Sequence, residues 1–230
     1  MEETKNCDCT PTMPLIGDKA PSFKAVTTNG EVNFPEDYKD RWVILFSHPA
    51  DFTPVCTTEF MTFSSMMDEF NALHCDLIAL SVDSVHAHIA WLRKIEELEW
   101  NGISHPVIKF PVIADITMEV AKKYGMIHSQ SSTAAVRAVF FIDPKHTIRT
   151  ILYYPASLGR NFKEIKRILL GLQRADKENV ATPANWKPGQ DTIIGAPSSH
   201  KDARARMTAP HAEDRYCLDW FLCFKKGEGE

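Results

Sequence analysis

The chain has 230 residues, of which 44% are hydrophobic, and its formal net charge is −4. This length is enough for one large domain, or for a core domain with a second, smaller domain. The mild negative charge gives no general affinity for polyanions, which disfavours nucleic acids and anionic membranes as partners. No apolar run approaches the roughly 18 residues of a membrane span, and the first residues lack the pattern of a secretory signal. These features favour a cytoplasmic protein.

The first elements expected along the chain are a leader, a hairpin and a buried strand. Residues 1–13 are polar and predict a mobile leader. An Asn-Gly step at Asn29 and Gly30 separates two short strand-like runs and favours a hairpin. Residues 42–47 form an unbroken apolar run, which is typical of a strand buried on both faces. A loop with two prolines follows this strand.

A helix is predicted after the loop. Apolar residues recur at helical spacing from Cys56 onward, and the helix is expected to run to about Leu73. The residues of this stripe are Phe60, Phe63, Met67 and Phe70. The next strand is predicted over residues 77–82, and Ser84 is expected to cap the helix that follows.

The rest of the core carries strands and a closing helix. Residues 111–114 predict a short strand, and residues 136–142 and 147–153 predict an antiparallel pair. A helix is expected from Phe162 to about Ala175. Because strands alternate with helices and end in a hairpin and a helix, the sequence predicts an α/β fold, a mixed sheet with flanking helices.

The composition changes after this last helix. Residues 181–200 contain three prolines and two glycines and show little periodicity. Residues 216–224 are strongly apolar and aromatic, so they are not expected to lie free in water. We therefore predict one domain over residues 14–175 and a smaller segment, residues 176–230, that packs on the core or on another subunit.

Six cysteines are spread over the chain. They are Cys7, Cys9, Cys56, Cys75, Cys217 and Cys223. In a cytoplasmic chain of this length they favour redox, metal-binding or buried thiols over a disulfide framework. Cys75 fits core packing. Cys7 and Cys9 are free thiols, a strained link or, with the C-terminal pair, half of a Cys₄ zinc site, although no Cys-x-x-Cys spacing supports that site.

Cys56 lies where the buried strand gives way to the predicted helix. Unpaired N–H groups and the positive end of the helix dipole favour the thiolate there, which is the reactive form of the thiol. The Thr53 hydroxyl is expected to accept a hydrogen bond from a substrate and to donate one to the sulfur. Pro49 and Pro54 restrict the loop and can shield the sulfur from water. The same pattern also suits a small buried thiol with Thr53 as a helix cap, so both interpretations stay open.

A cation near the sulfur would complete such a site. Arg137 lies in an otherwise apolar strand, where a guanidinium is costly to bury unless it faces an anion. A thiolate with a bound peroxide is one such partner, and Arg160 is placed to support the same site. The alternative is that Arg137 lies at a strand edge in solvent.

These residues resemble the peroxiredoxin family. Residues 49–56, Pro-Ala-Asp-Phe-Thr-Pro-Val-Cys, match its active-site pattern Pro-x-x-x-Thr-x-x-Cys. The longer string over residues 45–59 resembles the peroxiredoxin-6 branch closely. The resemblance continues through Arg137 and residues 154–161, and it covers roughly residues 14–224.

The resemblance implies a thioredoxin-like core, a C-terminal dimerisation domain and a thiol peroxidase that needs no metal or organic cofactor. The expected substrates are hydrogen peroxide and organic hydroperoxides. Cys56 resembles the peroxidatic cysteine and Pro49 the shielding proline. Thr53 and Arg137 resemble the groups that bind peroxide and stabilise the thiolate. The supporting positions near the site are matched by His48, Glu59 and Arg160.

Two departures from the branch matter. Where mammalian members carry a lipase-like serine, this chain has Arg41, so a phospholipase activity is not supported. The pair Cys217 and Cys223 resembles archaeal-type thioredoxin peroxidases, which form rings of five dimers. In those enzymes the second cysteine resolves the oxidised site of a neighbouring subunit. The resemblance thus implies that Cys223 resolves and Cys217 assists, with a thioredoxin-like reductant and a dimeric, ultimately decameric, assembly.

Two rival function classes remain at this point. Disulfide oxidoreductases use Cys-x-x-Cys at a helix start, but this chain has Glu59 where the second cysteine would lie. A ring-forming holdase or scaffold with an incidental thiol would suit the aromatic C-terminal stretch. Peroxide-dependent oxidation of thioredoxin distinguishes the enzyme from the scaffold.

Overall fold

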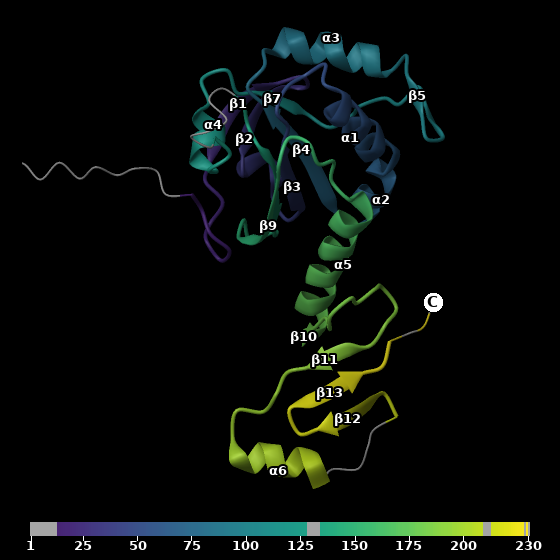
Figure 1. Ribbon diagram of the computed structural model, residues 1–230. Coiled ribbons are helices and arrows are strands. Elements are labelled where there is room, and N and C mark those ends of the chain that lie inside the picture. Colours follow the sequence, from purple (N-terminus) through teal and green to yellow (C-terminus); the bar gives the residue numbers. More distant parts are fainter. Residues whose placement is uncertain (1–12, 128–133, 209–212, 228, 230) are drawn as a thin grey trace, which may run out of the picture. The chain divides into compact units, whose positions relative to one another are not determined.

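The computed structural model describes residues 13–127, 134–208, 213–227 and 229 (Figure 1). The chain divides into two compact units, Met1–Arg160 and Asn161–Glu230. The predicted leader, with Cys7 and Cys9, lies outside the described residues except for Met13. The predicted boundary after residue 175 lies inside a helix of the second unit, and it stays a prediction. Among the described residues, no helix is long and apolar enough to cross a membrane.

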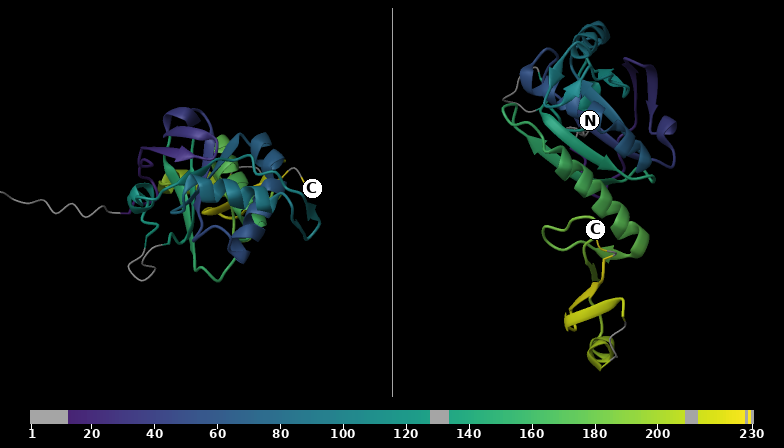
Figure 2. Two further views of the ribbon diagram at one scale, coloured as in Figure 1. Left: turned by 90° about the horizontal axis from the view of Figure 1, so that it is seen from above. Right: turned by 90° about the vertical axis from the view of Figure 1, so that its right-hand side faces the viewer.

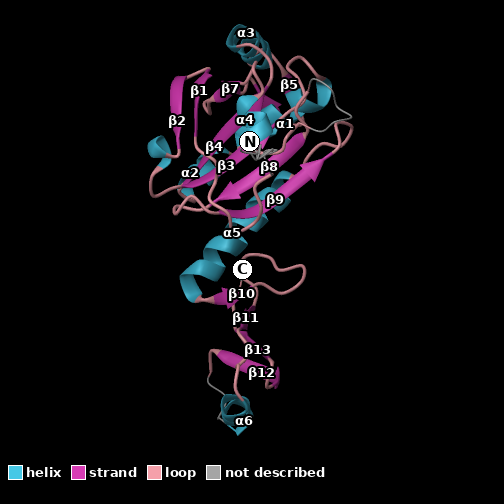
Figure 3. Ribbon diagram, turned by 90° about the vertical axis from the view of Figure 1, so that its left-hand side faces the viewer, coloured by secondary structure: helices cyan, strands magenta, loops and turns pink. Residues whose placement is uncertain are grey.

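The first unit is built on a seven-stranded mixed sheet with the order β2-β1-β7-β4-β3-β8-β9 (Figure 3). Its strands are β1 (Phe23–Thr27), β2 (Gly30–Phe34), β3 (Trp42–Ser47), β4 (Cys75–Ser81), β7 (Val112–Ala114), β8 (Arg137–Ile142) and β9 (Ile148–Tyr154). β3 is parallel to β4 and antiparallel to β8, and β8 pairs antiparallel with β9. The predicted mixed α/β sheet is therefore confirmed.

The central strand β3 has the burial that its apolar sequence predicts. All six of its residues are buried, because β3 lies between β4 and β8 and both of its faces are covered. Val43 and Leu45 belong to the apolar cluster on one face. Phe46 points to the other face, where its ring stacks on Phe63 with the centroids 4.3 Å apart.

The hairpin predicted at the Asn-Gly step joins β1 and β2. Thr27 pairs with Gly30, so the two loop residues are Thr28 and Asn29, one position earlier than the step itself. Gly30 takes φ of 103°, in the left-handed region that glycine adopts without strain. A second small hairpin, β5 (Glu99–Trp100) with β6 (Ile103–Ser104), was not predicted.

The helix predicted from Cys56 to Leu73 is wrong as one continuous helix. The structure has α1 (Pro54–Ser65) and α2 (Met67–Ala72), with a break at Met66. Near this break the Thr62 hydroxyl donates to the carbonyl four residues earlier and the Ser65 hydroxyl to the carbonyl three residues earlier. The amide of Met66 bonds to the carbonyl of Phe63, a tightened turn that ends α1.

Among its described residues the first unit has two further helices, α3 (Val85–Ile95) and α4 (Glu119–Lys123). A short 3₁₀ turn covers Glu36–Tyr38. The predicted cap of α3 is confirmed, since Ser84 Oγ accepts a hydrogen bond from the amide of Ala87 at 3.2 Å.

The described part of the second unit has two helices and a separate four-stranded sheet with the order β10-β11-β13-β12, whose strands are labelled in Figure 1. Figure 2 shows this unit, in green and yellow, from two further directions. Its elements are α5 (Phe162–Glu178), β10 (Val180–Ala181), β11 (Thr192–Ile194), α6 (His200–Thr208), β12 (Arg215–Asp219) and β13 (Leu222–Lys225). The apolar C-terminal stretch forms the β12–β13 hairpin. Its aromatic character has a packing role, because the rings of Tyr216 and Phe224 stack with centroids 5.1 Å apart.

Candidate functional site

Cys56 lies in the first turn of α1, directly after the strand β3 and its loop. Thr53 is the N-cap residue and Pro54 is the first helical residue, a position that proline suits because its missing N–H would have no intrahelical acceptor. The backbone N–H of Cys56 belongs to the same first turn, where N–H groups have no intrahelical acceptor and form the positive end of the helix dipole. The side chain is fully buried, with 0% exposure.

Arg137, the first residue of β8, brings its guanidinium to the sulfur. Its Nη1 lies 3.1 Å from Cys56 Sγ, across 81 positions of the chain. Its Nε and Nη2 both donate to the carbonyl oxygen of Ala156, at 3.2 and 2.9 Å. The residue is only 2% exposed, so the alternative that Arg137 lies in solvent at a strand edge is wrong.

Glu59 and Arg160 join this contact into one buried cluster. Glu59 Oε2 accepts from Arg137 Nη1 at 2.8 Å and from Arg160 Nη2 at 2.6 Å. Glu59 Oε1 accepts from both the Nε and the backbone amide of Arg160, each at 2.9 Å. The side chains of all three residues are at most 3% exposed.

The buried side chains of this cluster carry more positive than negative charge. Two guanidinium groups share one carboxylate, and an uncompensated buried charge is strongly destabilising. A negative charge on the Cys56 sulfur would lie 3.1 Å from Arg137 Nη1 and would balance the second guanidinium. The geometry therefore supports a reactive sulfur more than an inert buried thiol.

Pro49 and Thr53 lie on the loop before α1, with Thr53 three positions before Cys56, and both are half-buried. The Thr53 hydroxyl donates to the carbonyl of Ala50 at 2.9 Å. Since a hydroxyl has a single proton, Thr53 does not donate to the sulfur in this arrangement, contrary to one part of the prediction. Its oxygen keeps lone pairs that can accept a hydrogen bond from a substrate O–H.

His48 belongs to a second buried cluster, with Asp51 and His88. Asp51 lies 2.9 Å from His48 Nε2 through Oδ1 and 2.7 Å from His88 Nδ1 through Oδ2. The second ring nitrogen of His88 lies 3.1 Å from the carbonyl oxygen of Ile113. His48 Nδ1 is buried and has no hydrogen-bond partner among the described residues.

This second cluster has the donor types of a metal site, because one ligand atom from each of the three side chains lies within 4.8 Å of the others. Those atoms are already joined by hydrogen bonds, which accounts for the arrangement without an ion. The expectation that the protein needs no metal or organic cofactor stays a prediction, which metal analysis of purified protein tests.

The pKa values of His48 and Asp51 both lie below their ordinary values. Burial lowers the pKa of His48, although the hydrogen bond to Asp51 acts in the opposite direction. Burial alone would raise the pKa of Asp51, but the hydrogen bonds from His48 and His88 outweigh it and hold that pKa below its ordinary value. The native state therefore favours a neutral His48 beside an ionised Asp51.

Acid is expected to destabilise the protein through His48. Because the folded-state pKa is lowered, the unfolded chain takes up a proton below about pH 6.5 that the native state refuses. Stability is full above that pH and falls below it, by up to about 1.4 kcal/mol per pH unit for one proton. Denaturant unfolding from about pH 7.5 to about pH 5 measures this slope. His48→Asn should flatten the slope, and the exposed His86→Asn should not; equal slopes in all three proteins would contradict the assignment.

Asp51 and His88 were missed by the sequence interpretation. Asp51 lies inside the active-site string, but nothing local shows that its carboxylate faces two histidines. His88 did carry a signal, because it lies four residues before Leu92 and seven before Ile95 on the buried face of α3. Ile89, the next residue of α3, is 44% exposed and lies outside that buried face.

Two other residues have clear structural roles. Arg41, which occupies the position of the lipase-like serine of mammalian members, donates two hydrogen bonds to the Asp76 carboxylate, at 2.6 and 2.9 Å. Cys75 is 1% exposed, and burial raises the pKa of its thiol, which favours the neutral, unreactive form. That environment agrees with the packing role predicted for Cys75.

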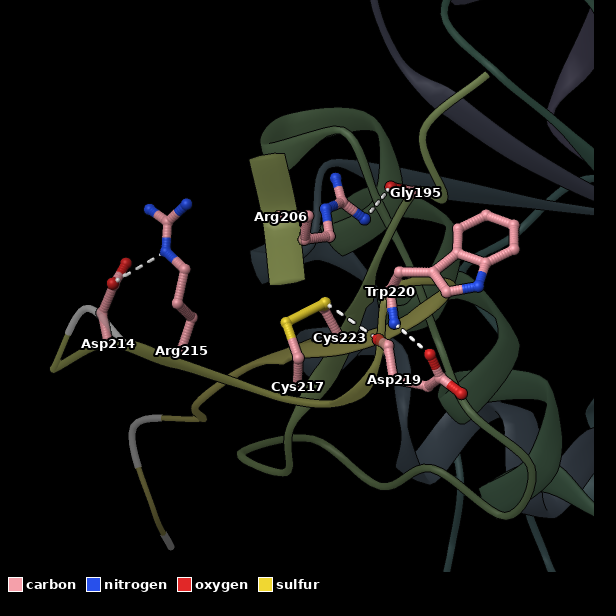
Figure 4. The surroundings of a disulfide bond; sticks show 8 residues. All are labelled: Gly195, Arg206, Asp214, Arg215, Cys217, Asp219, Trp220 and Cys223. Atoms are coloured by element: carbon pink, nitrogen blue, oxygen red, sulfur yellow. Dashed lines mark hydrogen bonds and ion pairs between the residues drawn. A yellow bond between two sulfur atoms is a disulfide. The ribbon is translucent and has the colours of Figure 1, made fainter. Parts of the chain in front are cut away.

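In the second unit, Cys217 and Cys223 are bonded to each other (Figure 4). They face each other across β12 and β13, and their Cα atoms are 4.0 Å apart. Sulfurs joined in this way cannot act as thiolate ligands, so the structure does not support a Cys₄ zinc site in this form. Cys7 and Cys9, the other two residues of that hypothesis, lie outside the described residues.

Comparison with known proteins identifies the family. The model of the AhpC/TSA family matches residues 16–151, and the model of the C-terminal domain of 1-Cys peroxiredoxin matches residues 171–209. A peroxiredoxin of Methanosarcina mazei is 62% identical over 216 residues, which are 93% of this chain and 98% of that protein. A peroxiredoxin of Aquifex aeolicus is 49% identical over 225 residues, which are 93% and 97% of the two chains.

Solved structures agree with these matches and confirm the fold class. A yeast mitochondrial 1-Cys peroxiredoxin is 38% identical with a TM-score of 0.78, over 94% of this chain and all of that one. A cysteine-to-serine mutant of peroxiredoxin 6 of Arenicola marina is 33% identical with a TM-score of 0.80, over 93% and 98% of the two chains. With family models matching both units and relatives matched along nearly their whole length, the chain belongs to the peroxiredoxin family of thiol peroxidases.

Proposed function

We propose that Cys56 is the peroxidatic cysteine and that it reduces hydrogen peroxide and organic hydroperoxides. The observation that carries the proposal is the 3.1 Å contact between Arg137 Nη1 and the buried sulfur. The thiolate attacks the nearer peroxide oxygen, a sulfur–oxygen bond forms and the oxygen–oxygen bond breaks. The leaving oxygen departs with the electron pair and takes up a proton, and Cys56 becomes a sulfenic acid.

The surrounding residues stabilise and position the reacting atoms. Arg137 and the Cys56 amide lie where they can stabilise negative charge on the leaving oxygen, and preorganised donors of this kind are worth about 3–4 kcal/mol each. Thr53 accepts from the peroxide O–H and so orients it. Glu59 and Arg160 hold Arg137 in place. Supporting roles fall to Pro49, which shields the sulfur, and to His48.

Recycling is assigned to Cys223. Its thiol condenses with the sulfenic acid of Cys56, of a neighbouring subunit, releasing water and forming a disulfide, and a thioredoxin-like dithiol then restores both thiols by exchange. Cys223 is 1% exposed, so the β12–β13 hairpin must open and α1 must partly unwind for the two sulfurs to meet. The choice of a thioredoxin-like reductant is supported by the related yeast 1-Cys enzyme, whose thiol is resolved via glutathione/thioredoxin systems.

We place this activity in a cytoplasmic homodimer that assembles further into a ring of five dimers, with residues 176–230 as the dimerisation segment. The C-terminal family match supports that segment. So do the large apolar side chains that the second unit exposes, which are Met207, Leu218, Trp220 and Phe221. Sedimentation velocity of the reduced protein measures the assembly.

Peroxide-dependent oxidation of thioredoxin by the full-length protein tests the proposal as a whole. We expect continuous turnover when peroxide, the protein and thioredoxin with its reductase are all present. A protein that assembles into rings but oxidises no thioredoxin would support the scaffold alternative instead.

Cys223→Ser is expected to separate the two halves of the cycle. The first oxidation of Cys56 needs no second cysteine, so one fast turnover should remain. Steady-state turnover with thioredoxin should fall to background, because the sulfenic acid is no longer converted to a disulfide. Rapid-mixing and steady-state assays of peroxide loss measure the two phases. Surviving steady-state turnover would move the resolving role to Cys217 or indicate a cycle with one cysteine.

A further inference from the structure

We propose that the pair Cys217 and Cys223 is a second redox centre, which takes the oxidising equivalent from Cys56 and presents it to the reductant at Cys217. The proposal rests on the function proposed above and adds to it a role for Cys217. It predicts that the active site is regenerated before any reductant arrives, with the oxidation stored in the C-terminal hairpin.

The hairpin itself keeps the two sulfurs together. Cys217 and Cys223 are direct cross-strand partners, and β13 is paired on its other edge with β11 through Cys223 and Ile194. Tyr216, next to Cys217, stacks on Phe224 and its hydroxyl lies 2.9 Å from an Asp191 carboxylate oxygen. These contacts do not depend on the disulfide, so the reduced hairpin also holds the two thiols side by side.

This placement determines the fate of a disulfide between Cys223 and another sulfur. Closing the hairpin again brings Cys217 opposite Cys223, and an intramolecular thiol at such a position has a very high effective concentration. Closure also restores the backbone pairing and the aromatic stack, which the open form has lost. A disulfide between Cys56 and Cys223 is therefore expected to convert into the cross-strand disulfide.

The exchange balances without any added oxidant. The Cys217 thiolate attacks the Cys223 sulfur of the Cys56–Cys223 disulfide, the Cys217–Cys223 bond forms, and Cys56 leaves as a thiolate. Its departure is favoured because Arg137 lies 3.1 Å from that sulfur in the closed site. Cys56 is then ready for a second peroxide while the first equivalent remains in the hairpin.

The different exposure of the two cysteines determines which sulfur of the cross-strand disulfide the reductant attacks. Cys223 is 1% exposed and its sulfur lies 3.5 Å from the carbonyl oxygen of Asp219, whereas Cys217 is only half-buried (Figure 4). A thiolate of an external dithiol therefore attacks Cys217 and releases Cys223 as the leaving thiolate. The second thiol of the reductant then attacks the mixed disulfide, releases Cys217 and leaves the reductant as a disulfide.

Peroxide stoichiometry without reductant tests the inference. The full-length protein carries Cys7→Ser and Cys9→Ser so that the N-terminal thiols take no part, and it is fully reduced before rapid mixing with peroxide. We expect this protein to consume about two equivalents of peroxide per chain rapidly. The same protein with the additional substitution Cys217→Ser should consume about one equivalent. After the first equivalent, alkylation and peptide mapping should find Cys217 bonded to Cys223 and Cys56 alkylated. The second equivalent should appear as a sulfenic acid on Cys56, trapped by a 1,3-diketone.

Two results would overturn the inference, and they differ from failure of the proposed function. A stable disulfide between Cys56 and Cys223 in the protein that retains Cys217, with no second equivalent consumed, would contradict the exchange. The direction of attack is tested with a thioredoxin variant that has a single thiol and therefore stays bonded to the cysteine it attacks, while the released thiol is capped by alkylation. We expect this variant to be bonded to Cys217. Finding it on Cys223 would contradict the direction of attack. Failure of the proposed function looks different, since no protein of the set would then consume peroxide rapidly.

Discussion

Cys56→Ser is expected to abolish peroxide reduction by the full-length protein. The serine hydroxyl stays un-ionised at neutral pH and is a poor nucleophile toward peroxide oxygen, so both the first turnover and the steady state should fall to the uncatalysed background. The fold should remain, because serine fills nearly the same volume in the first turn of α1. Peroxide loss after rapid mixing, with circular dichroism as a check on folding, measures the effect.

Cys75→Ala is the matched control. Cys75 is the other free cysteine among the described residues and is equally buried, but it has no guanidinium bonded to its sulfur. Its replacement should leave peroxide reduction near the wild-type rate. Near-full activity in Cys56→Ser, or loss of activity in Cys75→Ala with the fold intact, would contradict the assignment of the peroxidatic cysteine.

Glu59→Gln is expected to cause the largest loss of stability. The carboxylate lies between two buried guanidinium groups, at 2.8 and 2.6 Å, and glutamine keeps the shape but removes the charge. Breaking a buried ion pair by removing one partner costs about 3–5 kcal/mol, because a charge is left uncompensated. The free energy of unfolding, measured with urea on the reduced protein, should fall by that order.

Glu97→Gln provides the control for this loss. Glu97 also pairs with a cation, Lys94 at 2.6 Å, but both side chains are more than 60% exposed. Water screens such a pair, so its removal should leave the unfolding free energy unchanged within error. If Glu59→Gln were as stable as Glu97→Gln, the buried cluster would not be under the electrostatic constraint described here.

Periodicity alone predicted the elements with the clearest patterns. The unbroken apolar run of β3 and the pair β8–β9 are where the sequence indicated, because central strands must be apolar on both faces. The break at Met66 lies inside an apolar stripe that continues from α1 into α2, so periodicity could not predict it. The strands of the second unit are two to five residues long, too short for a periodic signal.

The candidate site was predicted in parts. The position of Cys56 after a strand and the presence of Arg137 in an apolar strand each carry a local signal. The contact between them joins residues 81 positions apart, so it required the fold or the family resemblance. The sharing of Glu59 by two guanidinium groups, and the link from His48 through Asp51 to His88, depend on side-chain directions that no spacing encodes.

The ionisation of the Cys56 sulfur at neutral pH tests the central claim most directly. Far-ultraviolet absorbance of thiolates is compared in reduced wild type, Cys56→Ser and Arg137→Ala. The buried cluster predicts an excess of about one thiolate per chain in the wild type over Cys56→Ser, and loss of most of that excess in Arg137→Ala. Equal absorbance in the wild type and Cys56→Ser would show a neutral thiol beside Arg137 and contradict the account.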